Sequence, residues 1–241
     1  MVDTTKLVLE LLTRRRDRIE TLLVTPDFLG EHRNDLLDPG VAPSIRLYQC
    51  PRKILDRLSD TQTAQETLAI VKQPTWAGPE IPQQPSLFGV YLDRLQDPTN
   101  VGTLIRTAAG FGLDAVWLSP GCADIFSPKV VRASAGTILT IPAFRDTEIS
   151  SLASSHLSWY AADSIPQGAI PLSSISSRPA KTMLAFGNES QGLSEQLRRI
   201  ADVRFCIPLE ANVESLNVAS AAAIGIYHFS VLPSAGARTN Q

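Results

Sequence analysis

From residue 86 onward, the sequence alternates short apolar segments with segments of helical character. The apolar segments predict buried strands at residues 86–92, 115–118, 137–142, 159–163, 183–186 and 203–207. The other segments predict helices at residues 101–109, 128–135 and 218–229. Because strands that alternate with helices pair through crossover connections, this part of the chain predicts an α/β fold with a mainly parallel sheet.

The residues before this series predict a smaller α/β unit. A helix is expected around residues 7–12, and the further expected elements are strands at 19–25, 44–49 and 68–72 and a helix at 51–58. Residues 73–85 then contain four prolines and few apolar side chains, which is typical of a linker. We therefore expect a small domain at 1–74, a linker at 75–85 and a larger domain at 86–241.

The amino-acid composition narrows the possible functional classes of the protein. Lys and Arg number 22 against 24 Asp and Glu, for a formal net charge of −2, so overall charge does not favour a nucleic-acid partner. Basic residues nonetheless gather at 14–18 and at 52–57, where a solvated helix face is an equally good interpretation. Cys50, Cys122 and Cys206 lie far apart and predict neither a disulfide framework nor a zinc site.

The chain has no apolar run long enough to cross a bilayer, and its first residues lack the pattern of a signal peptide. We therefore expect a cytoplasmic protein with no membrane partner.

The first polar motif is Asp-Pro-Thr-Asn at residues 97–100, which supplies turn and N-cap residues before a predicted helix. On that helix, Arg106 shares one face with Thr103 and Thr107. An arginine in this place needs an anionic partner, and its planar guanidinium is well shaped for an RNA phosphate. A structural ion pair is an equally good interpretation of Arg106 taken alone.

The second motif follows the apolar strand at 183–186 and reads Gly-Asn-Glu-Ser-Gln-Gly at residues 187–192. Ligands of parallel sheets bind at such carboxyl ends. Gly187 would let a ligand approach the backbone, and Asn188 and Glu189 would offer polar groups. The alternative is an ordinary turn in which Ser190 or Gln191 lies near a helix cap.

The third motif runs from Ile207 and Pro208 at a strand end, through a loop, to the small-residue helix at 218–229. Ser215 and Asn217 flank the apolar Leu216 just before that helix. Taken alone, Ser215 is better explained as the N-cap of the helix than as a functional residue.

Together these residues resemble the SpoU/TrmH family of RNA 2′-O-ribose methyltransferases, in the SPOUT superfamily. The first family motif is Asn followed six residues later by Arg, as at Asn100 and Arg106. The second is Gly-Asn-Glu after a strand, as at residues 187–189, and the third is Ile-Pro followed by Ser-Leu-Asn-Val, as at 207–208 and 215–218. The resemblance covers residues 87–232, with one departure at Ala211, where glycine is common.

The resemblance implies an S-adenosylmethionine-dependent RNA 2′-O-ribose methyltransferase without a metal, acting on ribosomal RNA or, as a second choice, transfer RNA. It implies a parallel sheet with a C-terminal trefoil knot, a homodimer whose active site draws on both subunits, and an N-terminal accessory domain that holds the RNA. The implied cofactor-binding residues are Phe186, Gly187, Ile207, Leu209, Leu216 and Asn217. The implied catalytic residues are Asn100, Arg106, Glu189, Ser215 and Asn217.

Within these implied roles, an arginine stays protonated, so Arg106 is interpreted as a phosphate clamp and not as a base. Glu189 would orient Arg106 or the cofactor, and Asn100 would help to position substrate and cofactor. Ser215 and Asn217 would complete the polar wall of the site.

Other functions fit the sequence less well. Gly110 and Gly112 lie at a helix end, not in a turn that opens a helix, so a dinucleotide-binding motif is not favoured. The spacing around Ser190 does not match that of a serine hydrolase, and His32, His156 and His228 lie outside every motif. The serious alternative is a non-catalytic RNA-binding protein that retains the methyltransferase fold.

Overall fold

A large parallel sheet organises residues 84–235 of the protein. The computed structural model describes residues 1–36, 45–59, 65–78, 84–152, 156–163, 168–210 and 212–235, so Ala211 and residues 79–83 of the predicted linker lie outside the described residues. Within the described part, seven strands pair in the order β6-β5-β4-β10-β7-β11-β8, and every pairing is parallel. These strands are β4 (Leu87–Asp93), β5 (Ala115–Leu118), β6 (Ala143–Phe144), β7 (Ser158–Ala162), β8 (Ile170–Pro171), β10 (Lys181–Gly187) and β11 (Val203–Cys206).

β10 is the central strand of this sheet, and both of its neighbours, β4 and β7, precede it in the chain. From β4, the chain continues outward to β5 and β6 on one side and places β7, β11 and β8 on the other. In open parallel sheets, the crevice beside such a reversal of strand order is where ligands bind, at the carboxyl ends of the strands. The topology therefore points to the ends of β4, β7 and β10.

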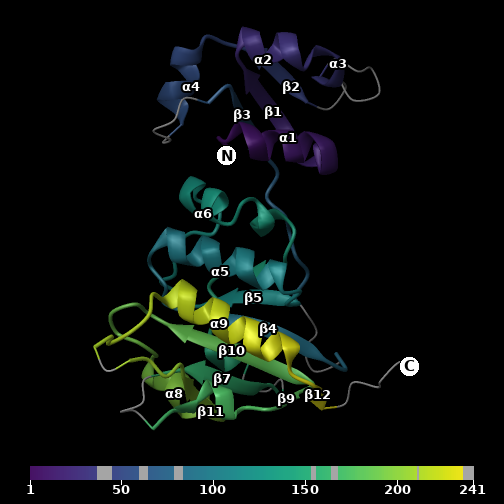
Figure 1. Ribbon diagram of the computed structural model, residues 1–241. Helices are drawn as coiled ribbons and strands as arrows, with labels where there is room; N and C mark the ends of the chain where they lie inside the picture. Colours follow the sequence, from purple (N-terminus) through teal and green to yellow (C-terminus); the bar gives the residue numbers. More distant parts are fainter. Residues whose placement is uncertain are drawn as a thin grey trace.

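Helices cover both faces of the sheet, and the alternation of side chains along β10 shows why (Figure 1). Leu184 and Phe186 belong to one apolar cluster, while Met183 and Ala185 belong to another. The first face is covered by α5 (Pro98–Gly110), α6 (Pro128–Ala133) and α9 (Val218–Val231); the second by α7 (Ile149–Leu152) and α8 (Glu195–Ile200). A strand that is apolar on both faces belongs between two helical layers, as the continuous apolar run predicted.

α5 begins at Pro98, three residues before the predicted start at residue 101, because the first residue of the predicted turn is already the cap. Asp97 is its N-cap, and the side-chain oxygen accepts a hydrogen bond from Thr99 N at 2.7 Å, with Pro98 in the first turn. Gly102 lies on the face toward α6, where an added Cβ would come within 2.8 Å of the Val130 carbonyl oxygen. Glycine there lets α6 pack closely on the helix that carries Asn100.

The strand predicted at residues 137–142 is wrong. A 3₁₀ helix occupies Thr137–Leu139, and the edge strand β6 contains only Ala143–Phe144. Gly136 turns the chain with a φ of 77°, and the Thr137 hydroxyl donates to Ser134 O at 2.7 Å. Such local bonds offer the backbone an alternative to a strand ladder.

The N-terminal unit has the five elements that the sequence predicted and, in addition, two short helices, α2 and α3, that it did not. Its three-stranded sheet has the order β2-β1-β3, with β2 parallel and β3 antiparallel to β1. The elements are α1 (Thr5–Arg14), β1 (Ile19–Val24), α2 (Pro26–Glu31), α3 (Arg33–Leu36), β2 (Arg46–Gln49), α4 (Arg52–Leu58) and β3 (Thr67–Val71). α1 buries Leu7, Val8, Leu11 and Leu12, the residues whose helical spacing predicted it.

The two units meet where α1 faces α6 (Figure 1). Arg132 on α6 donates to Asp3 Oδ2 at 2.6 Å, and Asp3 is 1% exposed. Leu7 lies against Gly136, so apolar side chains of both units join in one core cluster. A further small sheet pairs β9 (Arg178–Pro179) with β12 (Ser234–Ala235) beyond α9.

Candidate active site

A cavity of about 720 Å³ opens at the carboxyl ends of the central strands. Its walls come from the ends of β7, β10 and β11, from the loop at residues 188–192, and from the segment between β11 and α9. Small-molecule sites usually measure roughly 300–1,000 Å³. The cavity therefore has the size and place of a ligand site in a parallel α/β sheet.

Most of the predicted site residues contribute to this cavity. The members of its lining are Phe186, Gly187, Glu189, Ile207, Leu209, Ser215, Leu216 and Asn217. Phe186 is buried in the wall, whereas Leu209 and Ser215 are exposed at the surface. Asn100 and Arg106 are not part of the lining, so the structure divides the predicted residues into two groups.

Asn100 is nonetheless bonded directly to the cavity wall. Its Nδ2 donates to Glu189 Oε1 at 2.9 Å, and its Oδ1 accepts from Asn217 Nδ2 at 3.0 Å. Asn100 is 6% exposed, whereas Glu189 and Asn217 are exposed. One residue from each of the three sequence motifs therefore joins a single hydrogen-bonded set.

Arg106 lies apart from this set. It is exposed on α5, and no hydrogen bond or ion pair to it is found among the described residues. Six residues of helix correspond to about 9 Å along the axis and a rotation of about 240°, so Arg106 faces away from Asn100. Within one chain, Glu189 contacts Asn100 and not Arg106.

Gly187 is required for a reason that the sequence did not reveal. Asn188 and Gly192 exchange two backbone hydrogen bonds, of 3.0 and 2.9 Å, and so close the loop on itself. A Cβ added to Gly187 would lie 2.5 Å from Gly192 O and 2.6 Å from Leu193 N. Glycine is needed because the chain's own loop approaches the backbone here, although Gly187 also lines the cavity.

The cap of α9 is Asn217 and not Ser215. The Asn217 side-chain oxygen accepts from Ala219 N at 2.9 Å and from Ser220 N at 3.3 Å. The same side chain donates to Asn100 through Nδ2. Asn217 therefore has a structural and a site role at once, and the expectation that Ser215 caps the helix was wrong.

Two charged residues of the cavity lining, Asp163 and Arg198, lie outside all three sequence motifs and were not predicted. Asp163, which follows β7, has a side chain that is 6% exposed and pairs with Arg198 at 3.5 Å and Arg204 at 3.6 Å. Asp163 and Arg198 line the cavity. Asp163 could have been found as a polar residue at a strand end, whereas nothing in the sequence marks Arg198.

Burial raises the pKa of the Cys206 thiol, which also lines the cavity. A thiol with a raised pKa is a weak nucleophile at neutral pH, so Cys206 acts as a small wall residue. Among the described residues, no group of three or more His, Cys, Asp or Glu could hold a metal ion. None of the helices in that part of the chain is long and apolar enough to span a membrane.

Comparison with known proteins places this geometry in a family. Residues 88–227 match the SpoU rRNA Methylase family, and residues 5–77 match a family described as RNA 2′-O ribose methyltransferase substrate binding. An uncharacterized tRNA/rRNA methyltransferase of Synechocystis is 34% identical over 207 residues, which is 83% of this chain and 73% of that protein. The 23S rRNA (guanosine(2553)-2′-O)-methyltransferase RlmP of Bacillus subtilis is 33% identical over 89% of this chain and 90% of its own length.

Among solved structures, the AdoMet-bound rRNA methyltransferase from Sinorhizobium meliloti superposes with a TM-score of 0.77 at 26% identity. That match covers 94% of this chain and 85% of the other. Because the family match spans more than half of the chain and includes all three motifs, this protein belongs to the SpoU rRNA methylase family.

Proposed function

We propose that this protein transfers a methyl group from S-adenosylmethionine to a ribose 2′-hydroxyl of ribosomal RNA. The observation that carries the proposal is the hydrogen-bonded set of Asn100, Glu189 and Asn217 beside the cavity. A protein that only bound RNA would not need to hold these three side chains together at a small-molecule pocket. Ribosomal RNA is preferred to transfer RNA because the Bacillus subtilis relative is named for that substrate.

The cavity suits S-adenosylmethionine in size and in the character of its walls. Phe186, Ile207 and Leu216 provide apolar surface for the adenine ring, while Glu189 and Asn217 provide polar groups at the rim. Ligand sites typically combine such apolar walls with a few polar groups. When bound, S-adenosylmethionine supplies a methyl group on a positively charged sulfur.

The chain's own residues then align the RNA and stabilise charge. The ribose oxygen would take the methyl group with cleavage of the carbon–sulfur bond, and the proton of the ribose hydroxyl would pass to water. A fixed positive charge near that hydroxyl would stabilise the negative charge that develops on its oxygen. The guanidinium of Arg106 is a permanent donor suited to an RNA phosphate and to this developing charge. Asn100, fixed by Glu189 and Asn217, keeps the polar wall in one geometry, and Ser215 adds a hydroxyl to it.

Arg106 reaches a cavity in this proposal only if a second copy of the chain provides it. Within one chain, Arg106 is exposed and is not part of the cavity lining. We therefore infer a homodimer in which Arg106 of one subunit serves the cavity of the other.

An apolar surface on α9 and the end of α5 supports this homodimer. Ile224, Tyr227 and Val231 share one face of α9 and are 43%, 56% and 62% exposed. Phe111, 41% exposed at the end of α5, packs edge-on against Tyr227 at 5.8 Å. Because the opposite face of α9 is buried on the sheet, the helix is apolar on both sides, which is typical of a helix with a second partner.

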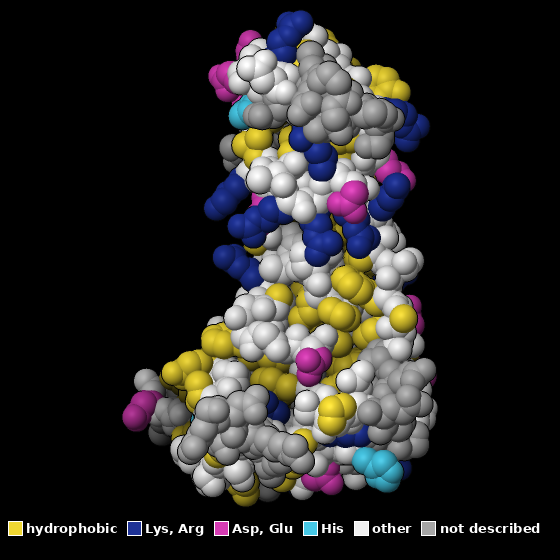
Figure 2. Space-filling view, turned by 90° about the vertical axis from the view of Figure 1, so that its right-hand side faces the viewer, with side chains coloured by type: hydrophobic (Ala, Val, Ile, Leu, Met, Phe, Trp, Pro, Cys, Tyr) yellow, Lys and Arg dark blue, Asp and Glu magenta, His cyan; other side chains and the backbone are white. Residues whose placement is uncertain are grey.

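The N-terminal unit is proposed to hold the RNA as an accessory domain at residues 1–74, joined through a linker at 75–85 to a catalytic domain at 86–241. Arg14 and Arg15 at the end of α1 are exposed, as are Arg52 and Lys53 at the start of α4. Figure 2 shows Lys and Arg side chains gathered around the level where the two units meet. Such a surface can bind RNA phosphates despite the negative net charge.

The path of the chain also supports the proposed trefoil knot in the C-terminal part. β10 enters between β4 and β7, and after β11 the chain returns to pack α9 against α5. We propose a cytoplasmic location for the enzyme, where ribosomal RNA is available.

The proposed function is tested with ribosomal RNA from cells that lack the gene. The purified protein is incubated with that RNA and S-adenosylmethionine carrying a labelled methyl group, and the modified ribose is mapped. Labelling of one 2′-hydroxyl is expected, and transfer RNA serves as the competing substrate. RNA binding without labelling, by a protein that binds S-adenosylmethionine, would favour the non-catalytic alternative.

The shared active site has its own test. Subunits with Arg106→Ala and subunits with Gly187→Val are each expected to be inactive. If Arg106 acts across the dimer, unfolding and refolding an equal mixture restores one complete site in each mixed dimer, for about a quarter of wild-type activity. If Arg106 acts within its own chain, the mixture stays inactive.

A further inference from the structure

Arg94, directly after β4, has a backbone conformation that is unusual for a residue with a side chain. Its φ is 58°, in the left-handed region that favours glycine. Two side chains hold this backbone in place: Arg94 N donates to Ser119 Oγ at 2.8 Å, and Arg94 O accepts from Asn188 Nδ2 at 2.8 Å. The conformation is therefore fixed on both sides by other parts of the fold.

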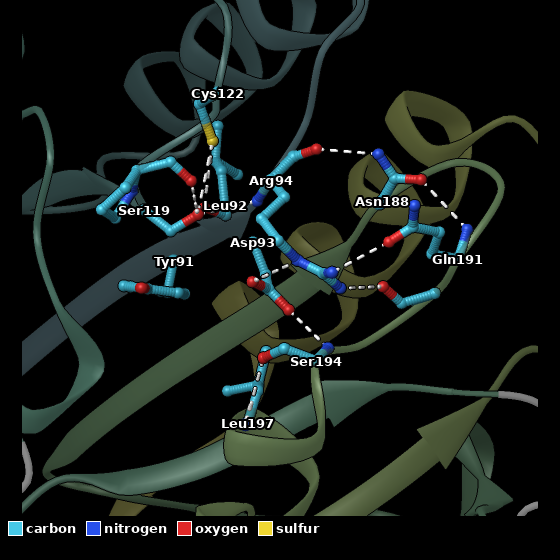
Figure 3. Close-up of polar contacts among 12 residues, drawn as sticks. Tyr91, Leu92, Asp93, Arg94, Ser119, Cys122, Asn188, Gln191, Ser194 and Leu197 are labelled. Carbon is cyan, nitrogen blue, oxygen red and sulfur yellow. Dashed lines mark hydrogen bonds and ion pairs between the residues drawn. The ribbon is translucent and has the colours of Figure 1, made fainter.

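The Arg94 side chain extends to the loop that forms one wall of the cavity (Figure 3). Its guanidinium donates to Gln191 Oε1 at 3.0 Å and to Gly192 O at 3.3 Å. The Nε donates to Asp93 Oδ1 at 3.3 Å. One planar side chain thus contacts both the loop and Asp93, the last residue of β4.

Asp93 completes the attachment. It is 2% exposed, and its Oδ2 accepts a hydrogen bond from Ser194 N at 2.6 Å. Ser194 is also the N-cap of α8, where its hydroxyl accepts from Leu197 N. Asp93 and Arg94 together therefore hold the loop at residues 188–192 and the segment that follows it.

The loop held in this way carries part of the site. Residues 188–192 all line the cavity, and Glu189 within them accepts the hydrogen bond from Asn100. The loop closes on itself through Asn188 and Gly192, but those bonds do not fix its place relative to the sheet. Arg94, which is not part of the cavity lining, provides bonds that fix the loop to the end of β4.

We infer that Arg94 is a positioning residue: with Asp93, it fixes the loop at residues 188–192 and thereby sets the affinity of the cavity for S-adenosylmethionine. The inference rests on the proposed function for the identity of the ligand. The position of the loop itself is independent of that identity, so the two can be tested separately.

The substitution Arg94→Gly separates positioning from simple stabilisation of the fold. Glycine adopts a φ of 58° without strain, which offsets part of the stability lost with the ion pair to Asp93, so the protein is expected to stay folded while the bonds to Gln191 and Gly192 are lost. Calorimetric titration should show affinity for S-adenosylmethionine lowered about 10- to 100-fold, because small displacements of a site have effects of this size. Arg94→Lys keeps the charge without the planar fork and should restore part of the affinity.

The matched control is His156→Gly. His156 is an exposed polar residue with a φ of 51° that is not part of the cavity lining. The substitution relaxes the same kind of backbone and should leave the affinity unchanged.

Hydrogen exchange without added ligand provides the second readout. Amides at residues 188–194 should exchange at least tenfold faster in Arg94→Gly than in wild type, with other regions unchanged. Wild-type affinity together with wild-type exchange in Arg94→Gly would overturn the inference. If the wild-type protein did not bind S-adenosylmethionine, the proposed function would fail, and hydrogen exchange alone would still decide whether Arg94 positions the loop.

Discussion

Asn100 and Arg106 lie on the same helix, α5, but differ in how far contacts within one chain fix their side chains. At the first turn, Asn100 is buried and bonded to Glu189 and Asn217. Two turns later, Arg106 is exposed, with no hydrogen bond or ion pair found among the described residues. The same helix therefore contains one side chain that is fixed by contacts within the chain and one that is exposed. In the proposed homodimer, one chain would build the pocket and the other would supply the positive charge for the RNA.

The largest effect is expected from disrupting the closed loop at residues 188–192, which carries the partner of Asn100. In Gly187→Val, the new side chain overlaps the backbone of Gly192 and Leu193, so the loop cannot close. Affinity for S-adenosylmethionine should fall more than about 100-fold, with methylation at background level. Calorimetry measures the affinity, and circular dichroism checks that the protein is folded.

Gly110→Ala is the matched control for that substitution, because a Cβ added at Gly110 meets no atom within 4 Å. It should bind S-adenosylmethionine as the wild type does. Normal affinity in Gly187→Val would contradict the role of the closed loop.

The second test acts on the exposed side chain of Arg106. Arg106→Ala should lower kcat about 10²- to 10³-fold, since it removes the positive charge that the proposed mechanism places near the reacting hydroxyl. Affinity for S-adenosylmethionine and the melting temperature should not change, because the side chain is exposed and has no described partner. Loss of cofactor binding in this variant would show that Arg106 also contributes to the cofactor pocket, contrary to the contrast between Asn100 and Arg106.

Asn100→Ala should have an intermediate effect that includes stability. The substitution removes the partner of both Glu189 and Asn217 from a buried position, at a cost of about 1–3 kcal/mol in the free energy of unfolding. Methylation should fall about tenfold through misplacement of the polar wall. Denaturant unfolding and steady-state assays measure the two effects, and Thr99→Ala, one residue away and exposed, is the control.

The smallest expected effect is a difference in stability between Asn217→Ala and Ser215→Ala. Loss of the helix cap in Asn217→Ala should cost about 1 kcal/mol, equal to roughly 2–4 °C in melting temperature. Ser215→Ala should change stability by less than about 0.5 kcal/mol, because Ser215 is exposed and does not cap α9. Equal melting temperatures for the two variants would argue against Asn217 as the cap.

Much of the fold followed from apolar periodicity and capping residues. The strand at residues 115–118 has the predicted bounds, and Asp97 caps α5 as expected. The strand predicted at 137–142 failed because its apolar residues are buried by a 3₁₀ turn, which gives the same local pattern as a short strand. Neither the order of the sheet nor the central place of β10 is encoded in local periodicity.

Only part of the site was predicted, because local motifs do not show which distant residues come together. The motifs identified eight of the cavity-lining residues, but not which side chains form hydrogen bonds with one another. The hydrogen bonds that join Asn100, Glu189 and Asn217 span 89 and 117 residues of sequence, so spacing alone does not reveal them. Arg94 was overlooked because its left-handed backbone and its bonds to the loop exist only in the folded chain.

The double role of Asn217 has a consequence for the order of events during synthesis. All seven strands of the large sheet precede Asn217 in the chain, so a nascent protein can pair its strands before this side chain has left the ribosome. The pocket lacks its last polar contact until α9 has formed and docked, because the residue that starts the helix also completes the site. Cofactor binding by stalled nascent chains of increasing length should therefore begin only once α9 has emerged, well after the sheet has been made.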